Sequence, residues 1–304
     1  MEPLRYMRPP LIVTAKVDPD LDGAGCAVAY AELLRGCGTP AVAVLAGRPD
    51  AEARHVLAQV RCSIPATPPP DYAGVVLVDM SALPGLPSFV APGAVLEVID
   101  HRVHGDPSTY FPKASIRIAE VGAAATLVHE RFAEAGFLPS SSSAILLQAG
   151  IQSNTQCLRG SVTSKRDIAA ATALQGSHPL PEGMLAAQFE ARRAEIQADL
   201  GAAIRRETKT FEHPDGAFRL AQLEFPGALE LAGDLEASGL AGRALINLVD
   251  PIRSISALVA LDPGVRSWVE RCTQLRFHGA IARAEPAMLR KQLVARMVDY
   301  RRPA

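Results

Sequence analysis

Acidic residues follow three separate apolar runs of the chain. The run at residues 11–15 leads into the segment KVDPDLDG, residues 16–23, in which positions 18, 20 and 22 are Asp. Two runs rich in β-branched residues end at Asp79 and at the tripeptide Asp-His-Arg, residues 100–102. If the runs are parallel strands, their carboxyl ends share one edge of a sheet, and ligands of such sheets bind at that edge. The spacing therefore predicts a polar cluster built from three distant segments.

We expect this cluster to hold a divalent metal ion. Carboxylates gathered without a cation repel one another and lose hydration, which costs several kcal/mol. Sets of oxygen ligands with one imidazole suit Mg²⁺ or Mn²⁺. The candidate ligands are Asp20, Asp22, Asp79, Asp100 and His101. For each Asp taken alone a structural role stays open, because an Asp after a strand is commonly an N-cap or turn residue.

The elements that must position these residues alternate as in a parallel α/β sheet. Apolar runs predict strands at 11–15, 41–46, 75–79 and 95–100, and periodic patterns predict helices at 23–34, 50–60, 121–134, 142–151 and 166–174. Ser164 and Asp167 predict a capping box before the last of these helices. Gly23 and Gly25 could be read as a dinucleotide-binding loop, but Val28 stands in the sixth place, which favours close packing of a helix on the sheet.

A second domain follows the segment GSHPLPEG, residues 176–183, which interrupts the regular pattern. We assign residues 1–178 to the first domain and 184–304 to the second. The second begins with a long amphipathic helix from Leu185 to Ile204, and short strands are expected at 218–225, 243–249 and 252–261. The prediction is an α/β protein with a parallel-sheet N-terminal domain and a smaller α+β C-terminal domain.

The composition narrows the class of protein. The 304 residues are 48% apolar and 21% charged, with a formal net charge of -1, so there is no strong signal for nucleic-acid binding. No apolar stretch reaches the roughly 18 residues that cross a bilayer, and the N-terminal segment lacks a signal-peptide core. The 5 cysteines are scattered without a CxxC pair. We expect a cytoplasmic protein with reduced thiols.

These motifs resemble those of the DHH phosphoesterase superfamily. The resemblance is closest to its branch of manganese-dependent (family II) inorganic pyrophosphatases and Prune-type exopolyphosphatases. It rests on VDPDLD at 17–22, on Val-Asp at 78–79, on Asp-His-Arg at 100–102, and on EVGAAAT, GIQSNT and TSKRD at 120–126, 150–155 and 163–167. It covers nearly the whole chain. The resemblance implies a DHH-type metal and phosphate domain, followed by a C-terminal domain that closes over a small phosphate-containing substrate.

The resemblance also implies roles for individual residues. One metal ion, Mn²⁺ or Mg²⁺, would be held by Asp22, Asp79 and His101 with Asn154 adjacent. Asp100 would be a ligand or would orient His101. Asn154 stands where the pyrophosphatases have a carboxylate ligand, and an amide oxygen is a neutral and weaker donor.

A second metal at Asp20 and Asp79 has less support, because Lys16 stands where the pyrophosphatases have a ligating His. Arg102 replaces an imidazole, and Arg binds phosphate oxygens well but cannot act as a general acid near neutral pH. His104 could replace that imidazole, although a solvated loop position is the simpler expectation.

The resemblance gives two hypotheses of function. In the first, the chain is a metal-dependent hydrolase of a phosphoanhydride such as pyrophosphate or short polyphosphate, bound between the two domains. Its catalytic residues would be Asp20, Asp79, His101 and Arg102, and its phosphate-binding residues Lys16, Arg102, Lys209, Arg290 and Lys291. In the second, the altered motif residues leave a protein that binds a nucleotide or phosphate ligand as a regulator without hydrolysis. A homodimer is left open.

Overall fold

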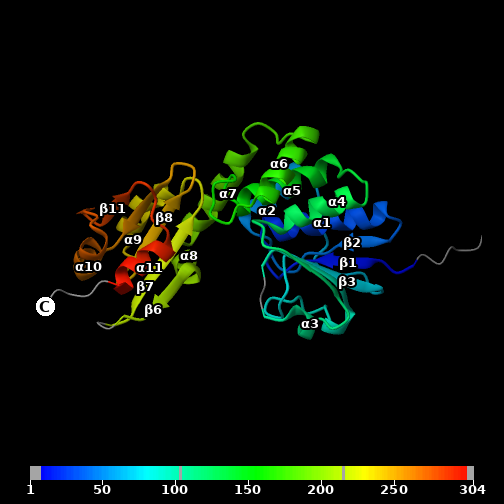
Figure 1. Cartoon of the computed structure of the whole chain (residues 1–304), viewed down its shortest axis with the longest axis horizontal. Helices are drawn as coiled ribbons and strands as arrows, with labels where there is room; N and C mark the ends of the chain where they lie inside the picture. The colour runs from blue at the N-terminus through cyan, green and yellow to red at the C-terminus, as the bar shows by residue number, and fades with distance from the viewer. Residues whose placement is uncertain (1–7, 103–104, 214–215, 300–304) are drawn as a thin grey trace, which may run out of the picture. The chain divides into compact units, whose positions relative to one another are not determined.

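The computed structural model describes residues 8–102, 105–213 and 216–299. It divides into two compact units, Met1–Gln188 and Phe189–Ala304, which are described separately below. Figure 1 shows both, with the first unit in blue to green and the second in green to red. None of the described helices is long and apolar enough to cross a membrane.

The first unit is built on a parallel sheet. The strands lie in the order β2 (Ala41–Ala43), β1 (Leu11–Thr14), β3 (Gly74–Val78), β4 (Val95–Asp100) and β5 (Ser115–Ile118). Every neighbouring pair is parallel. The four strands expected from the sequence are therefore confirmed. The edge strand β5 was not expected, because its four residues SIRI are only partly buried and lack a continuous apolar run.

Alternation along the strands separates two apolar cores. Val13, Val76 and Ile99 point to the face covered by the main helices, whereas Ile12 and Val75 point to the other face. The helices of this unit are α1 (Leu21–Gly36), α2 (Ala51–Gln59), α3 (Pro107–Tyr110), α4 (Ala124–Glu134), α5 (Ser141–Asn154) and α6 (Lys165–Ser177). Figure 1 shows α1, α4 and α5 above the sheet and α3 below it.

Local sequence explains how the helices begin. Asp20 caps α1 by accepting a hydrogen bond from the Gly23 amide, and the expected capping box of Ser164 and Asp167 is present at α6. The Gly23 backbone lies so close to β1 that an added Cβ would come within 2.9 Å of the Ala15 Cβ atom. This is the close helix–sheet packing that the sequence favoured for this glycine.

The second unit has a mixed sheet. Its order is β10 (Phe277–His278), β11 (Ile281–Ala284), β9 (Ile255–Val259), β8 (Leu245–Asp250), β7 (Phe218–Glu224) and β6 (Thr208–Phe211). Strands β7 and β8 run parallel, and the other neighbouring pairs in the described part of this sheet are antiparallel. The described helices wholly within this unit are α8 (Leu200–Glu207), α9 (Ala232–Ser238), α10 (Pro263–Thr273) and α11 (Arg290–Asp299), with a short 3₁₀ turn at Ala228–Leu231. A second 3₁₀ turn, Pro92–Ala94, belongs to the first unit. The expected α+β architecture is confirmed.

One expectation for this region was wrong. The sequence predicted a single helix from Leu185 to Ile204, but the chain forms α7 (Met184–Ala198) and then α8. Asp199 separates them, because its side chain accepts a hydrogen bond from the Ala202 amide and caps a new helix. The apolar stripe continues across the break, so periodicity alone did not reveal it.

Candidate metal centre

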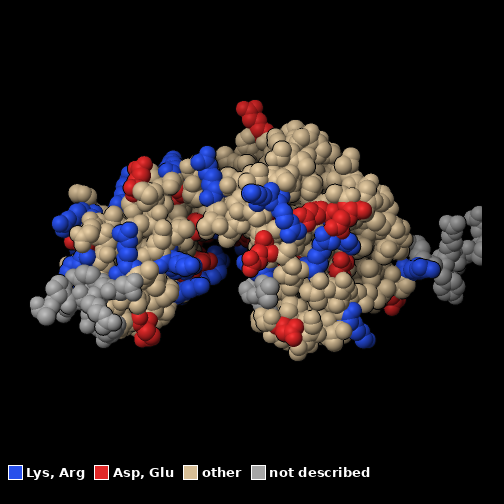
Figure 2. Space-filling model, viewed as in Figure 1, with Lys and Arg blue, Asp and Glu red and all other residues tan. Residues whose placement is uncertain are grey.

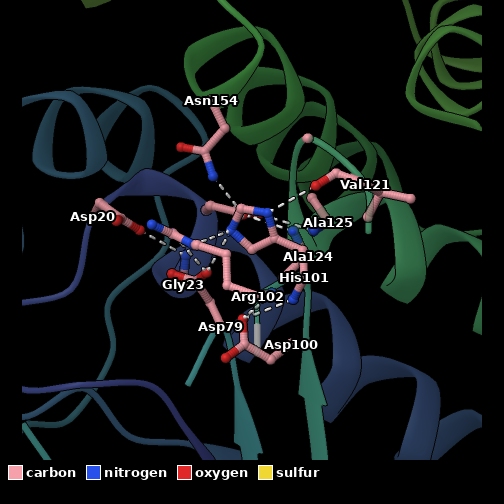
Figure 3. A network of polar contacts seen from close by, with 12 residues as sticks. Asp20, Gly23, Asp79, Asp100, His101, Arg102, Val121, Ala124, Ala125 and Asn154 are labelled. Atoms are coloured by element: carbon pink, nitrogen blue, oxygen red, sulfur yellow. Dashed lines mark hydrogen bonds and ion pairs between the residues drawn. The ribbon is translucent and has the colours of Figure 1, made fainter. Parts of the chain in front are cut away.

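The carboxyl ends of β1, β3 and β4 bring together three buried side chains. Asp22 lies in the first turn of α1, Asp79 directly after β3, and His101 directly after β4. One potential ligand atom from each lies within 4.8 Å of the other two. His101 Nε2 is 3.3 Å from Asp79 Oδ1 and 4.0 Å from Asp22 Oδ2. Figure 3 shows this convergence of Asp79 and His101 beneath Asn154.

Asp79 is the centre of the cluster. Its side chain is fully buried, and neither carboxylate oxygen has a hydrogen-bond partner among the described residues. The residue has a φ of 52°, and its amide donates to the Ile99 carbonyl at 2.8 Å. A left-handed conformation is uncommon outside glycine, so the fold holds this carboxylate against a local cost. Burial and the nearby charge of Asp20 raise the pKa of Asp79 to about 8.

His101 is oriented by a main-chain carbonyl. Its Nδ1 lies 3.0 Å from the Val121 carbonyl, so Nδ1 carries the hydrogen and Nε2 faces the carboxylates. Burial opposes protonation of the ring, but Asp79 and Asp22 outweigh it and raise the pKa of His101 to about 9. Metal-binding histidines are commonly fixed in this manner. The Val121 carbonyl had no signal in the sequence, because every residue carries one.

Asp22 has a second role that the sequence did not reveal. The N-cap of α4 is Ala123, which has no capping side chain, and Asp22 caps this helix instead. Its carboxylate accepts hydrogen bonds from the amides of Ala124 at 2.7 Å and Ala125 at 2.8 Å. The positive end of the α4 dipole therefore faces this carboxylate. Burial is the main reason that the pKa of Asp22 is nevertheless raised.

Asn154 contacts a side chain of the cluster, whereas Asp100 contacts the backbone next to it. The Asn154 amide nitrogen donates to Asp22 Oδ2 at 2.7 Å, so it is the nitrogen of this side chain that faces Asp22. Asp100 Oδ1 accepts from the amides of His101 at 2.7 Å and Arg102 at 3.2 Å. Asp100 thus holds the backbone that carries the imidazole. The proposal that either residue is itself a metal ligand stays a prediction.

Two cationic side chains flank Asp79. Lys16 Nζ lies 2.6 Å from Asp20 Oδ2 and 3.8 Å from Asp79 Oδ2. On the other side, Arg102 Nη2 lies 3.5 Å from Asp79 Oδ1, and Arg102 Nε donates to His101 Nε2 at 2.9 Å. The Lys16 ammonium lowers the pKa of Asp20, although burial opposes this shift.

Two cavities of the first unit adjoin these residues. One of about 500 Å³ is lined by residues that include His101, Arg102, Gly122 and Asn154. The other, of about 320 Å³, is lined by residues that include Lys16, Asp79 and Arg102. Half of the Arg102 side chain is exposed, so its guanidinium can meet a ligand in either space. His104 lies outside the described residues.

The predicted phosphate-binding residues of the second unit lie on β6 and α11. Lys209 is an exposed residue of β6, and Arg290 begins α11, with exposed Lys291 next to it. Arg290 Nη1 donates to the Glu207 carbonyl at 2.9 Å. The structure thus brings Arg290 to the segment just before Lys209, although about 80 residues separate them. Figure 2 shows that basic and acidic side chains are interspersed over the visible face of each unit.

The residues of the first unit fit one divalent cation. Three candidate ligand atoms converge, and the two oxygens of Asp79 are buried and accept no hydrogen bond from the described residues, a costly arrangement that the nearby Lys16 and Arg102 offset only in part. Two carboxylates and one imidazole make a donor set suited to Mn²⁺ or Mg²⁺. A cation that binds Asp22 Oδ2 would take the lone pair that now accepts from Asn154.

Comparison with known proteins identifies relatives in sequence. No protein-family model matches the chain. Over 163 residues it is 32% identical to a probable manganese-dependent inorganic pyrophosphatase of Deinococcus radiodurans, a match that spans 52% of this chain and half the length of that relative. A second probable manganese-dependent inorganic pyrophosphatase, from Streptococcus mutans, is 26% identical over 276 residues, 83% of this chain and 86% of the relative.

Solved structures show the same fold. A Methanococcus jannaschii protein assigned to the family II inorganic pyrophosphatases has a TM-score of 0.55 at 18% identity, over 95% of this chain and all of that one. An exopolyphosphatase-related protein of Bacteroides fragilis has a TM-score of 0.51 at 12% identity, over 94% of this chain and 90% of that one. The chain therefore shares the α/β fold of these two solved structures. The resemblance to manganese-dependent pyrophosphatases is confirmed.

Proposed function

We propose that the chain is a divalent-metal-dependent hydrolase of a phosphoanhydride, such as pyrophosphate or short polyphosphate. The observation that carries the proposal is the buried group of Asp22, Asp79 and His101 beside a cavity lined by Arg102. The names of the relatives in sequence, manganese-dependent inorganic pyrophosphatases, support the choice of both metal and substrate class.

In the proposed mechanism Asp22, Asp79 and His101 would hold the metal ion. A bound divalent cation polarises phosphoryl oxygens and lowers the pKa of water, which makes water a nucleophile at neutral pH. The chain's own residues position the His101 imidazole and neutralise the charge of the phosphate. Asp100 holds the His101 backbone, and the Val121 carbonyl fixes the ring. The half-exposed Arg102 binds phosphate oxygens and stabilises the charge that develops on them.

The second unit supplies further phosphate-binding residues in this proposal. Lys209 and Lys291 are exposed and carry positive charge, and Arg290 is tethered to the Glu207 carbonyl. Replacement of Lys209 and Lys291 with Gln should raise the KM for the phosphate substrate without changing Mn²⁺ affinity. An unchanged KM in both variants would remove these residues from the proposed site.

A second function is favoured by one specific feature. Arg102 donates a hydrogen bond to His101 Nε2 and Asn154 donates one to Asp22 Oδ2, so protein donors already engage two of the three candidate ligand atoms. A chain of this kind could bind a nucleotide or phosphate ligand as a regulator without hydrolysing it. Calorimetry would then show ligand binding, while no product forms.

A measurement of phosphate release distinguishes the hydrolase from the regulator that binds without hydrolysis. The assay uses pyrophosphate and tripolyphosphate with Mn²⁺, Mg²⁺ or Co²⁺ in turn, with the Asp79→Asn variant as control. The proposed hydrolase releases phosphate with at least one of these metals, and the variant does not. Absence of turnover with every metal and substrate at high protein concentration would contradict hydrolysis and favour the binding function.

A further inference from the structure

Lys16 occupies a defined place between two carboxylates. Its ammonium lies 2.6 Å from Asp20 Oδ2 and 3.8 Å from Asp79 Oδ2. Asp20 Oδ1 is also engaged, because it accepts the Gly23 amide at the start of α1. Asp79 Oδ1 faces the other way, toward His101 Nε2. Asp79 therefore has one oxygen on the side of the candidate metal site and one on the side of Lys16.

The segment that carries Lys16 is fixed on both flanks. The Val17 amide donates to the Gly85 carbonyl at 2.8 Å, and the Asp18 amide donates to the Ala46 carbonyl at 3.0 Å. Asp18 has a φ of 54°, and its side chain accepts the Arg48 amide at 2.6 Å. The Lys16 side chain is about one-third exposed. The backbone that carries Lys16 is therefore held in place by hydrogen bonds to the segments at Ala46 and Gly85.

Lys16 and Arg102 already place positive charge beside the carboxylates of the cluster. Lys16 Nζ lies 2.6 Å from Asp20 Oδ2 and 3.8 Å from Asp79 Oδ2, and Arg102 Nη2 lies 3.5 Å from Asp79 Oδ1. One divalent ion among Asp22, Asp79 and His101 would add two further positive charges. A second divalent ion would leave an excess of positive charge in a largely buried site, and it would have to share Asp20 and Asp79 with an ammonium that has no lone pair to offer.

We propose that Lys16 is a built-in cation that takes the place of a second metal ion, so that the chain holds one divalent ion in its site. This inference rests on the metal site of the proposed function and adds to it the number of ions and the role of a residue. The Lys16 ammonium forms an ion pair with Asp20 and lies 3.8 Å from Asp79 Oδ2. The ammonium also lines the 320 Å³ cavity, where it can meet a phosphate oxygen.

The test counts Mn²⁺ ions bound by the full chain and by Lys16 variants. Equilibrium dialysis with metal analysis gives stoichiometry and affinity, and electron paramagnetic resonance reports whether two bound Mn²⁺ ions are coupled. The native chain should bind one uncoupled ion in this site. Lys16→His, which removes the charge and adds a ligand, should bind two coupled ions. Lys16→Gln should bind Mn²⁺ at least tenfold more tightly, because a repelling charge is gone.

Control variants separate this effect from a general change of charge. Lys16→Arg keeps the positive charge and should still bind one ion. Lys113→Gln changes the net charge equally at an exposed position just before β5, and its Mn²⁺ affinity should match that of the native chain. Circular dichroism verifies that each variant is folded.

The outcomes distinguish this inference from the proposed function. Two coupled Mn²⁺ ions in the native chain would overturn the role of Lys16 while leaving hydrolysis in place. Unchanged stoichiometry in Lys16→His together with unchanged affinity in Lys16→Gln would also overturn it. One ion that becomes two in Lys16→His, without any hydrolysis by the native chain, would support this inference and contradict the hydrolase. A native chain that binds no Mn²⁺ would overturn both.

Discussion

Asp22 and Asp79 should differ sharply in what they contribute to stability, although both are assigned to the same metal. Asp22 is 1% exposed and accepts the amides of Ala124 and Ala125 and the Asn154 side chain. Asp22→Ala would leave two buried backbone donors unsatisfied, at about 1–3 kcal/mol each. Relief of repulsion from neighbouring carboxylates offsets part of this, so we expect a net loss of about 2–4 kcal/mol.

Asp79→Asn, in contrast, should not lower the free energy of unfolding. The Asp79 oxygens accept no hydrogen bond from the described residues, and burial beside Asp20 raises the pKa of this carboxyl to about 8. Removal of its charge should leave the free energy of unfolding unchanged or raise it by about 1 kcal/mol, since a buried and unsatisfied charge is costly.

Thermal denaturation in EDTA at pH 7.5, followed by circular dichroism, compares the two variants with the native chain. A change of 1 kcal/mol moves Tm by about 2–4 °C for domains of this size. Asp22→Ala should therefore lower Tm by roughly 5–15 °C, while Asp79→Asn keeps or raises it. Equilibrium dialysis should show that both have lost Mn²⁺ binding. Equal destabilisation by the two substitutions would refute the distinct roles derived from the hydrogen bonds.

Three further predictions concern Arg102, Asp167 and Gly23 of the first unit. Arg102→Gln should raise the KM for pyrophosphate at least tenfold in a steady-state assay, and an unchanged KM would exclude contact between this guanidinium and the substrate. Asp167→Asn should lower the free energy of unfolding by about 2–4 kcal/mol at pH 7 in urea titrations, because the Asp167 carboxylate accepts from the Gly122 amide, Thr126 Oγ1 and Ser164. These bonds hold the pKa of Asp167 below its usual value despite burial. The loss in free energy of unfolding caused by Asp167→Asn should therefore be complete at pH 7 and become smaller below about pH 4, where the native carboxylate takes up a proton. A loss that becomes larger in acid would contradict the role of the ionised carboxylate. Gly23→Ala should weaken Mn²⁺ binding, because the new Cβ would lie 2.9 Å from Ala15 Cβ and 3.3 Å from Asp79 Oδ2. An Mn²⁺ affinity equal to that of the native chain in equilibrium dialysis would show that the backbone at Gly23 can shift to accommodate the methyl group.

Much of the first unit was predictable, because its signals are local and strong. Parallel strands buried on both faces are continuous apolar runs, and their carboxyl ends meet at one edge by geometry. This geometry predicts that Asp22, Asp79 and His101 lie in one cluster, as the structure shows. The capping box of Ser164 and Asp167 was equally local, since its two members are three residues apart.

The parts that could not be predicted depend on contacts between distant segments. Nothing near Ala123 indicates that α4 is capped by Asp22, about 100 residues earlier. The direction of the Asn154 amide is set by that same carboxylate. Edge strands such as β5 and β10 are too short for a hydrophobic pattern, and the break at Asp199 leaves the apolar stripe intact.

Anomalous diffraction from crystals grown with Mn²⁺ tests the central claim most directly. We expect a manganese peak within coordination distance of Asp22, Asp79 and His101 in the first unit, and none beside Lys16. A manganese ion found only elsewhere, or Asp79 left without any metal at saturating Mn²⁺, would contradict the site on which the proposed chemistry depends.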